Sequence, residues 1–332
     1  MSEPAGWPAG RLPLSDDRRD SLLARLRPAF ADRLAAPGLD GPVADALEPV
    51  LLPLAAWLDR VTQAADGVPV IGLCGAQGSG KTTLAELLAW LLREGFRRQA
   101  ALLSLDDFYL GRAARQSLAA TVHPLFATRG VPGTHEIGLA RSVLDRLQRR
   151  QTASLPRFDK GLDDRLPESQ WPTRREPVDL VLFEGWCIGA RPEPGARLRR
   201  AINALERDED PDGTWRGAVN AALAGSYAAL FRRLDRLVML HVPDWDSVRR
   251  WRRQQEQSLP SGRRMDARAL RRFLMHYERL TRWMLGELPE RADVTLCLRR
   301  DHRFGAVHLR GQGGPPGIRP RGSPPRGPSP PA

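Results

Sequence analysis

The pattern of hydrophobic and polar positions divides the chain near residue 67. Before that point apolar residues recur at helical spacing, as at Leu22, Leu23 and Leu26, which follow a polar stretch at 15–17 that is suited to cap a helix. A second apolar segment covers residues 43–61, and a glycine- and proline-containing break at 38–42 separates the two. The pattern predicts a helical N-terminal extension over residues 1–66.

From residue 68 onward, short apolar runs alternate with longer amphipathic segments. The runs are typical of buried strands and cover residues 68–73, 100–105, 178–183, 236–242 and 293–298. Helical spacing covers residues 81–92, 136–150 (with Thr134 as the expected N-cap), 219–234, 245–257 and 267–287. Buried strands that alternate with helices indicate an α/β fold in which helices cover both faces of a mainly parallel sheet. We therefore predict a three-layer α/β domain over residues 67–305.

The last part of the chain has a different composition. Residues 311–332 contain eight prolines and six glycines in 22 positions, which leaves too few apolar side chains to build a core. We predict a disordered C-terminal tail over residues 306–332.

Charge and cysteine content narrow the class of protein. The 332 residues carry a formal net charge of +12, but only two of the 51 basic residues, Lys81 and Lys160, are lysines. Such a bias indicates arginine-rich codon usage more than a nucleic-acid groove, so we expect no nucleic-acid partner. Three cysteines far apart in the sequence are not typical of disulfides or a zinc site and favour a reducing, cytoplasmic compartment. No apolar run is long enough to span a membrane, and no signal peptide is evident, so we expect no membrane partner.

A phosphate-binding loop follows the first predicted strand. Residues 75–82 fit the pattern G-x-x-x-x-G-K-[ST] at every fixed position, with a strand before them and a helix after them. Glycines allow backbone N–H groups to turn toward phosphate oxygens at a helix N-terminus. In this pattern the lysine contacts the β- and γ-phosphates and the threonine ligates Mg²⁺. The residues expected to hold the phosphates of ATP are Gly75, Ala76, Gln77, Gly78, Ser79, Gly80, Lys81, Thr82 and Thr83.

Two further predicted strands end in acidic residues. Asp106 and Asp107 follow the second strand, and Glu184 ends the third. Because ligands of open α/β sheets lie beyond the carboxyl ends of the strands, these acids are expected beside the phosphates. A carboxylate there can accept the proton of an attacking hydroxyl, and another can hold Mg²⁺. We assign Asp106 as the base and Glu184, with Thr82, as the metal ligands. Asp107 can instead orient the loop, and helix capping or solvation is the structural alternative for these acids.

Several stretches resemble known small-molecule kinases. The phosphate loop, the Asp-x-Phe-Tyr after the second strand and the Phe-Glu-Gly of the third resemble the uridine kinase, phosphoribulokinase and pantothenate kinase group of P-loop kinases. Within this group, seven stretches of the chain are similar to D-glycerate 3-kinases. They are SLDDFYL (104–110), HPLFATRGVPGTHE (123–136), LPRFDKGLDDR (155–165), VLFEGWCIGARP (181–192), NALERDEDPDGTWRGAVN (203–220), WRRQQEQ (251–257) and HYERLTRWML (276–285).

This resemblance implies a P-loop fold, ATP and Mg²⁺ as cofactors, and phosphorylation of a small hydroxyl-bearing acceptor, D-glycerate. It implies Asp106 as the base and Lys81 as the phosphate-binding lysine. It also implies a mobile lid over about residues 249–264, with arginines that close on the transferring phosphoryl group. The expected lid arginines are Arg249, Arg252 and Arg253.

The acceptor of such a kinase is a small anion, which cationic or hydroxyl donors recognise. Two of the quoted segments offer such donors and one aromatic wall. The candidates are Arg129, Thr134, His135, Phe158, Lys160 and Arg165. Solvated surface charges are the structural alternative for these residues. The polar helix at 276–282 is as well suited to buried support as to substrate contact.

Several other functions share the phosphate loop. A regulatory GTPase needs an Asn-Lys-x-Asp motif, and neither lysine of the chain follows an asparagine. A nucleic-acid-stimulated ATPase needs a pair of acids where this chain has Glu184 followed by glycine. A nucleotide switch without an acceptor remains an alternative, as do uridine, cytidine or pantothenate as acceptors.

Overall fold

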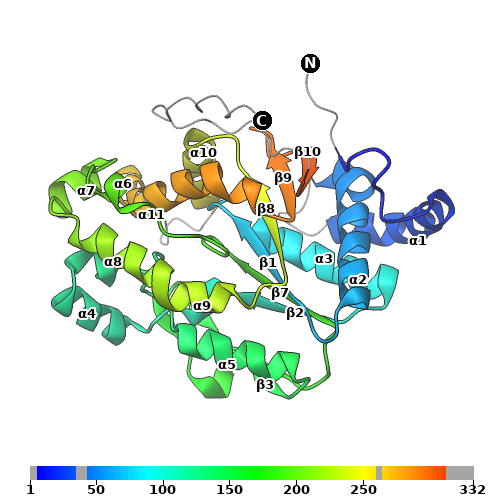
Figure 1. The fold of residues 1–332 in the computed structure, drawn as a ribbon, viewed down its shortest axis with the longest axis horizontal. Helices are drawn as coiled ribbons and strands as arrows, with labels where there is room; N and C mark the ends of the chain where they lie inside the picture. Colours follow the sequence, from blue (N-terminus) through cyan, green and yellow to red (C-terminus); the bar gives the residue numbers. More distant parts are fainter. Residues whose placement is uncertain (1–5, 35–42, 259–263, 312–332) are drawn as a thin grey trace, which may run out of the picture.

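The centre of the molecule is a six-stranded sheet (Figure 1). The structure is a computed structural model, and it describes residues 6–34, 43–258 and 264–311. The strand order is β10-β9-β8-β1-β7-β2, parallel throughout except for β10 against β9. The strands are β1 (Val70–Gly75), β2 (Ala100–Ser104), β7 (Leu180–Gly185), β8 (Arg236–His241), β9 (Val294–Leu298) and β10 (Phe304–Leu309). The predicted α/β fold and its five strands are thus confirmed.

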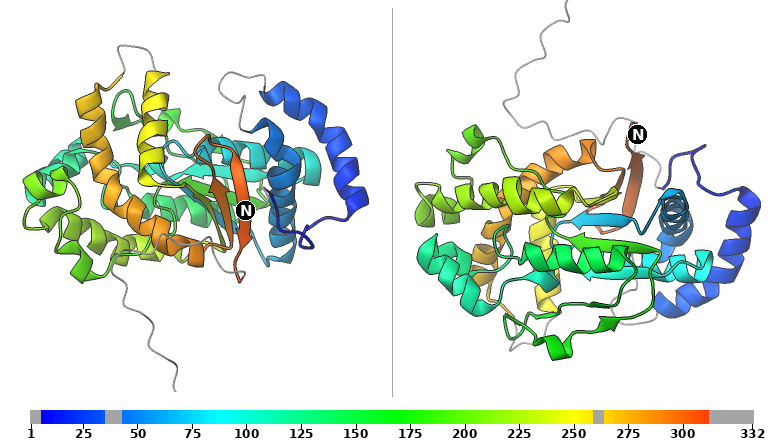
Figure 2. Two further views of the ribbon diagram at one scale, coloured as in Figure 1. Left: turned by 90° about the horizontal axis from the view of Figure 1, so that it is seen from above. Right: turned by 60° about the horizontal axis from the view of Figure 1, so that its bottom comes forward.

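Helices form a layer on each side of the sheet. Figure 1 shows α1, α2 and α3 on one side, and α8, α9 and α11 on the other. The helices are α1 (Asp16–Leu34), α2 (Leu52–Ala64), α3 (Lys81–Phe96), α4 (Arg112–Thr121), α5 (Ile137–Gln148), α6 (Gly195–Leu198), α7 (Ala204–Glu209), α8 (Thr214–Ala222), α9 (Ala228–Phe231), α10 (Trp245–Gln257) and α11 (Ala267–Glu287). Figure 2 shows α10 and α11 side by side, well away from α1.

The N-terminal helices share the core of the α/β domain. The helix α2 packs against α3, the helix that follows the phosphate loop. Leu51, Leu54 and Leu58 are fully buried in the same hydrophobic cluster as the strands of the sheet. At the chain start, Gly6 pairs with β10: its N–H donates to the Gly305 carbonyl, and its carbonyl accepts from the Val307 N–H. The helical N-terminal extension therefore covers one face and one edge of the sheet.

Two local expectations differ from the structure. Residues 306–309, which were expected in the tail, complete β10, because this edge strand pairs with β9 and with Gly6. Residues 312–332 of the expected tail and the whole of the break at 38–42 lie outside the described residues. Thr134 does not cap α5, whose N-cap is Glu136. The Thr134 hydroxyl instead accepts from the Gly130 N–H and donates to the Val131 carbonyl.

Within the described ranges, every helix is too short or too polar to cross a membrane.

The packing of α2 on α3 generates a test of the shared core. Leu58→Ala should lower the free energy of unfolding by about 2–5 kcal/mol, because it leaves a cavity in a tightly packed region. Leu12→Ala is the matched control, since the Leu12 side chain is 36% exposed and its loss should cost about 0.5 kcal/mol or less. Urea denaturation of both variants measures the difference. Equal stabilities would show that α2 is not part of the core.

Candidate active site

The register of three neighbouring strands brings the predicted site together. Ser104 of β2 lies beside Glu184 of β7, which lies beside Leu73 of β1. Asp106 and Gly75 each follow two residues after these positions. Since the strands are parallel, the phosphate loop, Glu184 and Asp106 meet at one edge of the sheet.

The phosphate loop is a turn that only glycine fits at Gly78. This residue has φ +76°, and a Cβ placed on it would lie 3.1 Å from the Cβ of Trp251. His302 Nε2 donates to the Gly78 carbonyl over 3.1 Å, and the His302 ring packs on Trp251 with centroids 3.9 Å apart. α10 and the β9–β10 turn thus hold the outer side of the loop. Lys81 is the first residue of α3, directly after the loop, and its positive charge lies near enough to Asp106 to lower the pKa of that carboxylate.

Thr82 and Glu184 lie together at the base of the loop. The Thr82 hydroxyl donates to Glu184 Oε1 over 3.1 Å. Glu184 is buried, and its Oε2 has no hydrogen-bond partner among the described residues. A buried carboxylate oxygen of this kind needs a donor or a cation. The pair therefore fits the donor set expected for Mg²⁺.

Asp106 lies in the single turn Leu105–Phe108 directly after β2. Its Oδ1 accepts from the Tyr109 hydroxyl at 3.0 Å, and its Oδ2 lies 2.6 Å from Lys160 Nζ. Burial alone would raise the pKa of Asp106, but the charges of Lys160 and Lys81 and the hydrogen bond from Lys160 outweigh it. They hold this pKa well below its usual range, so the carboxylate is ionised.

Asp107 bonds a neighbouring hairpin, in line with the expectation that it can orient the loop. Its carboxylate bonds Arg157 Nη1 at 3.1 Å and the N–H of Phe158 at 3.2 Å. These bonds anchor the hairpin formed by β4 (Phe158–Asp159) and β5 (Asp164–Arg165), which has Lys160 in its turn. Asp107 therefore positions the hairpin, whereas Asp106 faces the Lys160 ammonium.

The candidate acceptor residues gather around Asp106, but most are already paired. Arg129 bonds Asp163 and lies 5.4 Å from the centre of the Phe158 ring. Arg165 bonds Glu136 and the Tyr109 carbonyl. His135 stacks on Tyr109 with centroids 4.4 Å apart. Of this set, Lys160 is the cation whose partner is Asp106 itself, and its side chain is 61% exposed.

A fully buried arginine supports this arrangement. Arg115 is 1% exposed, and its guanidinium donates to the carbonyls of Leu110, Ala127 and Asp163 and pairs with the Asp163 carboxylate. It thereby joins the loop after Asp106, the 127–129 segment and the hairpin. The sequence offered no signal for Arg115, because one arginine among so many does not stand out.

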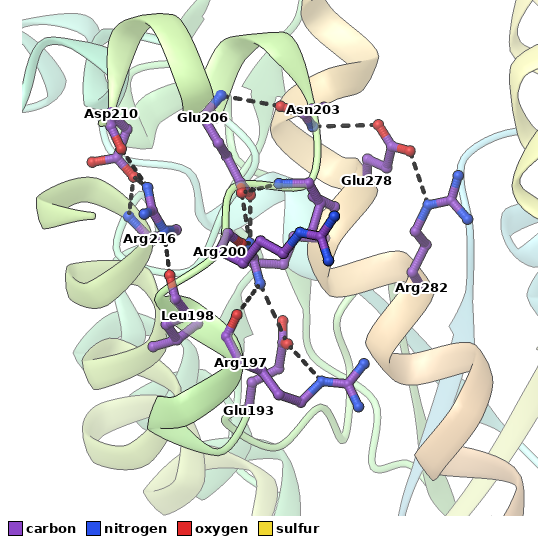
Figure 3. Close-up of polar contacts among 12 residues, drawn as sticks. Glu193, Arg197, Leu198, Arg200, Asn203, Glu206, Asp210, Arg216, Glu278 and Arg282 are labelled. Atoms are coloured by element: carbon purple, nitrogen blue, oxygen red, sulfur yellow. Dashed lines mark hydrogen bonds and ion pairs between the residues drawn. The ribbon is translucent and has the colours of Figure 1, made fainter. Parts of the chain in front are cut away.

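The helix α11 supports the loop around residues 129–134, hereafter the acceptor loop, which contains the candidate residues Arg129 and Thr134. The Tyr277 hydroxyl donates to the Arg129 carbonyl at 3.1 Å. Figure 3 shows the polar cluster beside α11, which is built on buried carboxylates. Glu206, fully buried, pairs with Arg279 of α11 at 2.6 Å, and the equally buried Asp210 pairs with Arg216 at 2.7 Å. Tyr277 and Arg279 of α11 thus support neighbouring segments, whereas the Arg282 side chain, which pairs with Glu278, is 55% exposed.

The three predicted lid arginines lie on different sides of α10, and the backbone N of Arg252 lies 3.4 Å from a Cβ placed on Gly78 in the phosphate loop. Trp251 of α10 contacts the loop, and Arg249 and Arg253 lie two residues to either side of it, so they project from the opposite side of the helix. There they line a cavity of about 220 Å³ between α10 and α11. Arg252 bonds Glu256 at 2.7 Å. Residues 259–263 of the expected lid lie outside the described part of the chain.

The sheet order and the loop at the end of β1 place the chain among the P-loop proteins that bind nucleotide phosphates. No family model matches the chain. An uncharacterized kinase of Schizosaccharomyces pombe, mug58, is 33% identical over 237 residues, which are 68% of this chain and 84% of that protein. The chloroplastic D-glycerate 3-kinase of Arabidopsis thaliana is 32% identical over 203 residues, 58% of this chain and 42% of that protein. Among solved structures, a D-glycerate 3-kinase from Cryptococcus neoformans var. grubii has a TM-score of 0.64 at 23% identity and covers 78% of this chain and 96% of its own.

The match to mug58 extends over most of both chains and shows the family. This chain belongs to the phosphoribulokinase and uridine kinase family of P-loop small-molecule kinases. It is an ATP-dependent phosphotransferase.

The contact between Gly130 and Tyr277 generates a test of the acceptor loop. Gly130 has φ +135°, and a Cβ on it would lie 2.0 Å from the Tyr277 hydroxyl oxygen. Gly130→Ala should therefore lower the free energy of unfolding by about 1–3 kcal/mol. Gly138→Ala is the control, because nothing lies within 4 Å of its added Cβ in α5, and it should be neutral or slightly stabilising. Thermal melts of both variants measure the effect, and a neutral Gly130→Ala would contradict this packing.

Proposed function

We propose that the chain is a D-glycerate 3-kinase, which transfers the γ-phosphate of ATP to D-glycerate and yields 3-phosphoglycerate and ADP. The observation that carries this proposal is the surroundings of Asp106. Segments 123–136 and 155–165, which resemble glycerate kinases, lie around this carboxylate, and an exposed lysine lies 2.6 Å from it. An acidic acceptor suits such a cation.

The reaction follows from the positions of these groups. An acceptor hydroxyl donates a hydrogen bond to Asp106 and attacks the γ-phosphorus in line with the leaving oxygen. The new O–P bond forms, the bond between the γ-phosphorus and its bridging oxygen breaks, and Asp106 accepts the hydroxyl proton. Lys81 neutralises charge on the phosphates. The proposed Mg²⁺ ligands are Thr82 and Glu184, and when bound the ion neutralises phosphate charge. The described residues hold no cluster of three or more His, Cys, Asp or Glu suited to a metal, so phosphates and waters would complete its shell.

Lys160 has two roles in this proposal. In the structure its ammonium group is paired with Asp106 Oδ2, an oxygen to which an acceptor hydroxyl would donate its hydrogen bond. We infer that the acceptor displaces the ammonium, which then pairs with the carboxylate of glycerate. Because the nearby positive charge lowers the pKa of Asp106, this displacement also makes Asp106 a stronger base when the substrate is present.

A nucleoside acceptor is the second candidate, and the aromatic residues near Asp106 do not favour it. Tyr109 stacks on His135, and the Phe158 ring lies within 6 Å of the guanidinium groups of both Arg115 and Arg129. These rings are engaged with one another and with cations. Stacking on a base would require them to rearrange.

The compartment follows as a further proposal. The cysteines of the described residues form no disulfide, and Cys74 and Cys187 are buried. This supports a reducing compartment such as the cytoplasm.

The first experiment measures ATP consumption with Mg²⁺ and a panel of D-glycerate, L-glycerate, uridine, cytidine and pantothenate. We expect turnover that depends on D-glycerate. Asp106→Asn should lower kcat by about 10²–10⁴-fold and leave ATP binding intact, because the amide cannot accept the proton.

Lys81→Ala is the control that should abolish turnover with every acceptor. Stimulation by another acceptor would replace glycerate in this proposal. Phosphate release that no acceptor changes would favour a nucleotide switch. Wild-type turnover in Asp106→Asn would exclude Asp106 as the base.

The pairing of Asp106 with Lys160 also predicts how the activity depends on pH. Asp106 works as an ionised base, so kcat/KM for the acceptor falls as pH drops through the pKa that Asp106 has in the free enzyme. Lys160→Met removes a charge that lowers this pKa and should move the acidic limb of the profile to higher pH. Lys160→Arg keeps the charge and should leave the limb near its original position. An unchanged limb in Lys160→Met would show that this ion pair does not control Asp106 in solution.

A further inference from the structure

His135 and Tyr227 form a buried pair that lies beside Asp106 and is not used by the mechanism above. His135 Nδ1 lies 2.5 Å from the Tyr227 hydroxyl, and the Gly133 N–H donates to the same hydroxyl over 3.1 Å. Tyr227 is fully buried and His135 is 6% exposed. Tyr227 ends the π-helical segment Leu223–Tyr227 between α8 and α9, a local distortion that is frequent at functional sites.

The hydrogen-bond pattern determines where the proton of His135 lies. The Gly133 N–H can only donate, so the Tyr227 oxygen accepts from it. Burial raises the pKa of Tyr227 well above its usual value, so the hydroxyl keeps its proton. Its acceptor among the described residues is His135 Nδ1. An imidazole whose Nδ1 accepts carries its proton on Nε2.

The His135 ring is also neutral. Burial lowers its pKa to about 3, although the charge of Asp106 opposes the shift. His135 and Asp106 are near enough for each to alter the pKa of the other, and Tyr109, which stacks on His135, donates its hydroxyl proton to Asp106. The Nε2–H group is therefore a neutral hydrogen-bond donor.

We propose that Gly133 and Tyr227 hold His135 as the Nε2–H tautomer, so that it donates a hydrogen bond to a carboxylate or hydroxyl oxygen of the acceptor. This inference rests on the proposed kinase function for its ligand, but the tautomer is a property of the protein alone. His135 thereby selects for an acceptor oxygen near Asp106, and Tyr227 is a positioning residue.

Long-range ¹H–¹⁵N NMR of the full chain tests the tautomer without any assay of activity. We expect the His135 signals, assigned by their loss in His135→Gln, to show a protonated Nε2 and an unprotonated Nδ1 at neutral pH. His276 is an internal control, because we expect its ring to carry the proton on the other nitrogen. Its Nδ1 lies 3.1 Å from the Arg272 carbonyl, which can only accept, so this ring should be protonated at Nδ1. In Tyr227→Phe, the Nδ1 resonance of His135 should shift because its donor is lost.

Kinetics test the donor role. His135→Asn should raise the KM for D-glycerate by about tenfold or more, as expected for a lost hydrogen bond to a charged group, and should leave the KM for ATP unchanged. His135→Gln places an amide N–H near the position of Nε2–H and should recover part of the loss. Tyr227→Phe should raise the acceptor KM in the same direction.

A wild-type His135 protonated at Nδ1 would overturn the proposal whatever the kinase assay shows. An unchanged acceptor KM in His135→Asn would overturn the donor role. A protein with the expected tautomer but no turnover with any acceptor would contradict the proposed function and support the assignment of the tautomer.

Discussion

The chemistry of this molecule depends on the fixed register of β2, β7 and β1. Ser104, Glu184 and Leu73 lie side by side on three parallel strands, and a shift of one residue would move an acid by about 3.3 Å and turn its side chain to the other face. β1 and β7 are buried along their whole lengths. Apolar packing on both faces therefore holds the register that sets the distance between the phosphate loop and the acids.

The acceptor side is held by polar contacts rather than by apolar packing. Arg115 connects three loops through carbonyl oxygens, and Arg279 connects α11 to the buried carboxylate of Glu206. A guanidinium can bond several carbonyl and carboxylate oxygens at once, because it stays charged and has five N–H donors in a fixed planar geometry. Part of the arginine excess of the chain is thus used inside the protein, which gives these residues a role that net charge alone does not reveal.

The sequence predicted best what depends on local pattern. The continuous apolar runs identified the five inner strands, and the spacing of glycines, Lys81 and Thr82 identified the phosphate loop. It missed β10, whose half-buried edge pattern is weak and whose partners include Gly6 at the other end of the chain. It also missed His302 and Tyr227, because each acts on a residue far away in the sequence. The prediction that Thr134 caps α5 was wrong, because the Thr134 hydroxyl forms its hydrogen bonds within its own loop. The directions in which Arg249 and Arg253 project could not be predicted, because they depend on how α10 packs.

The pairing of Gly6 with β10 has a consequence for the order in which the molecule is made. Gly6 leaves the ribosome first among the described residues, but its partner Ala306 is synthesised 300 residues later. At roughly 5–20 residues per second, the delay is on the order of 15–60 s. During that time the N-terminal segment lacks the strand that secures it, and the apolar faces of α1 and α2 depend on α3 for cover. The nascent chain therefore completes this edge of its sheet only after the residues of β10 have left the ribosome.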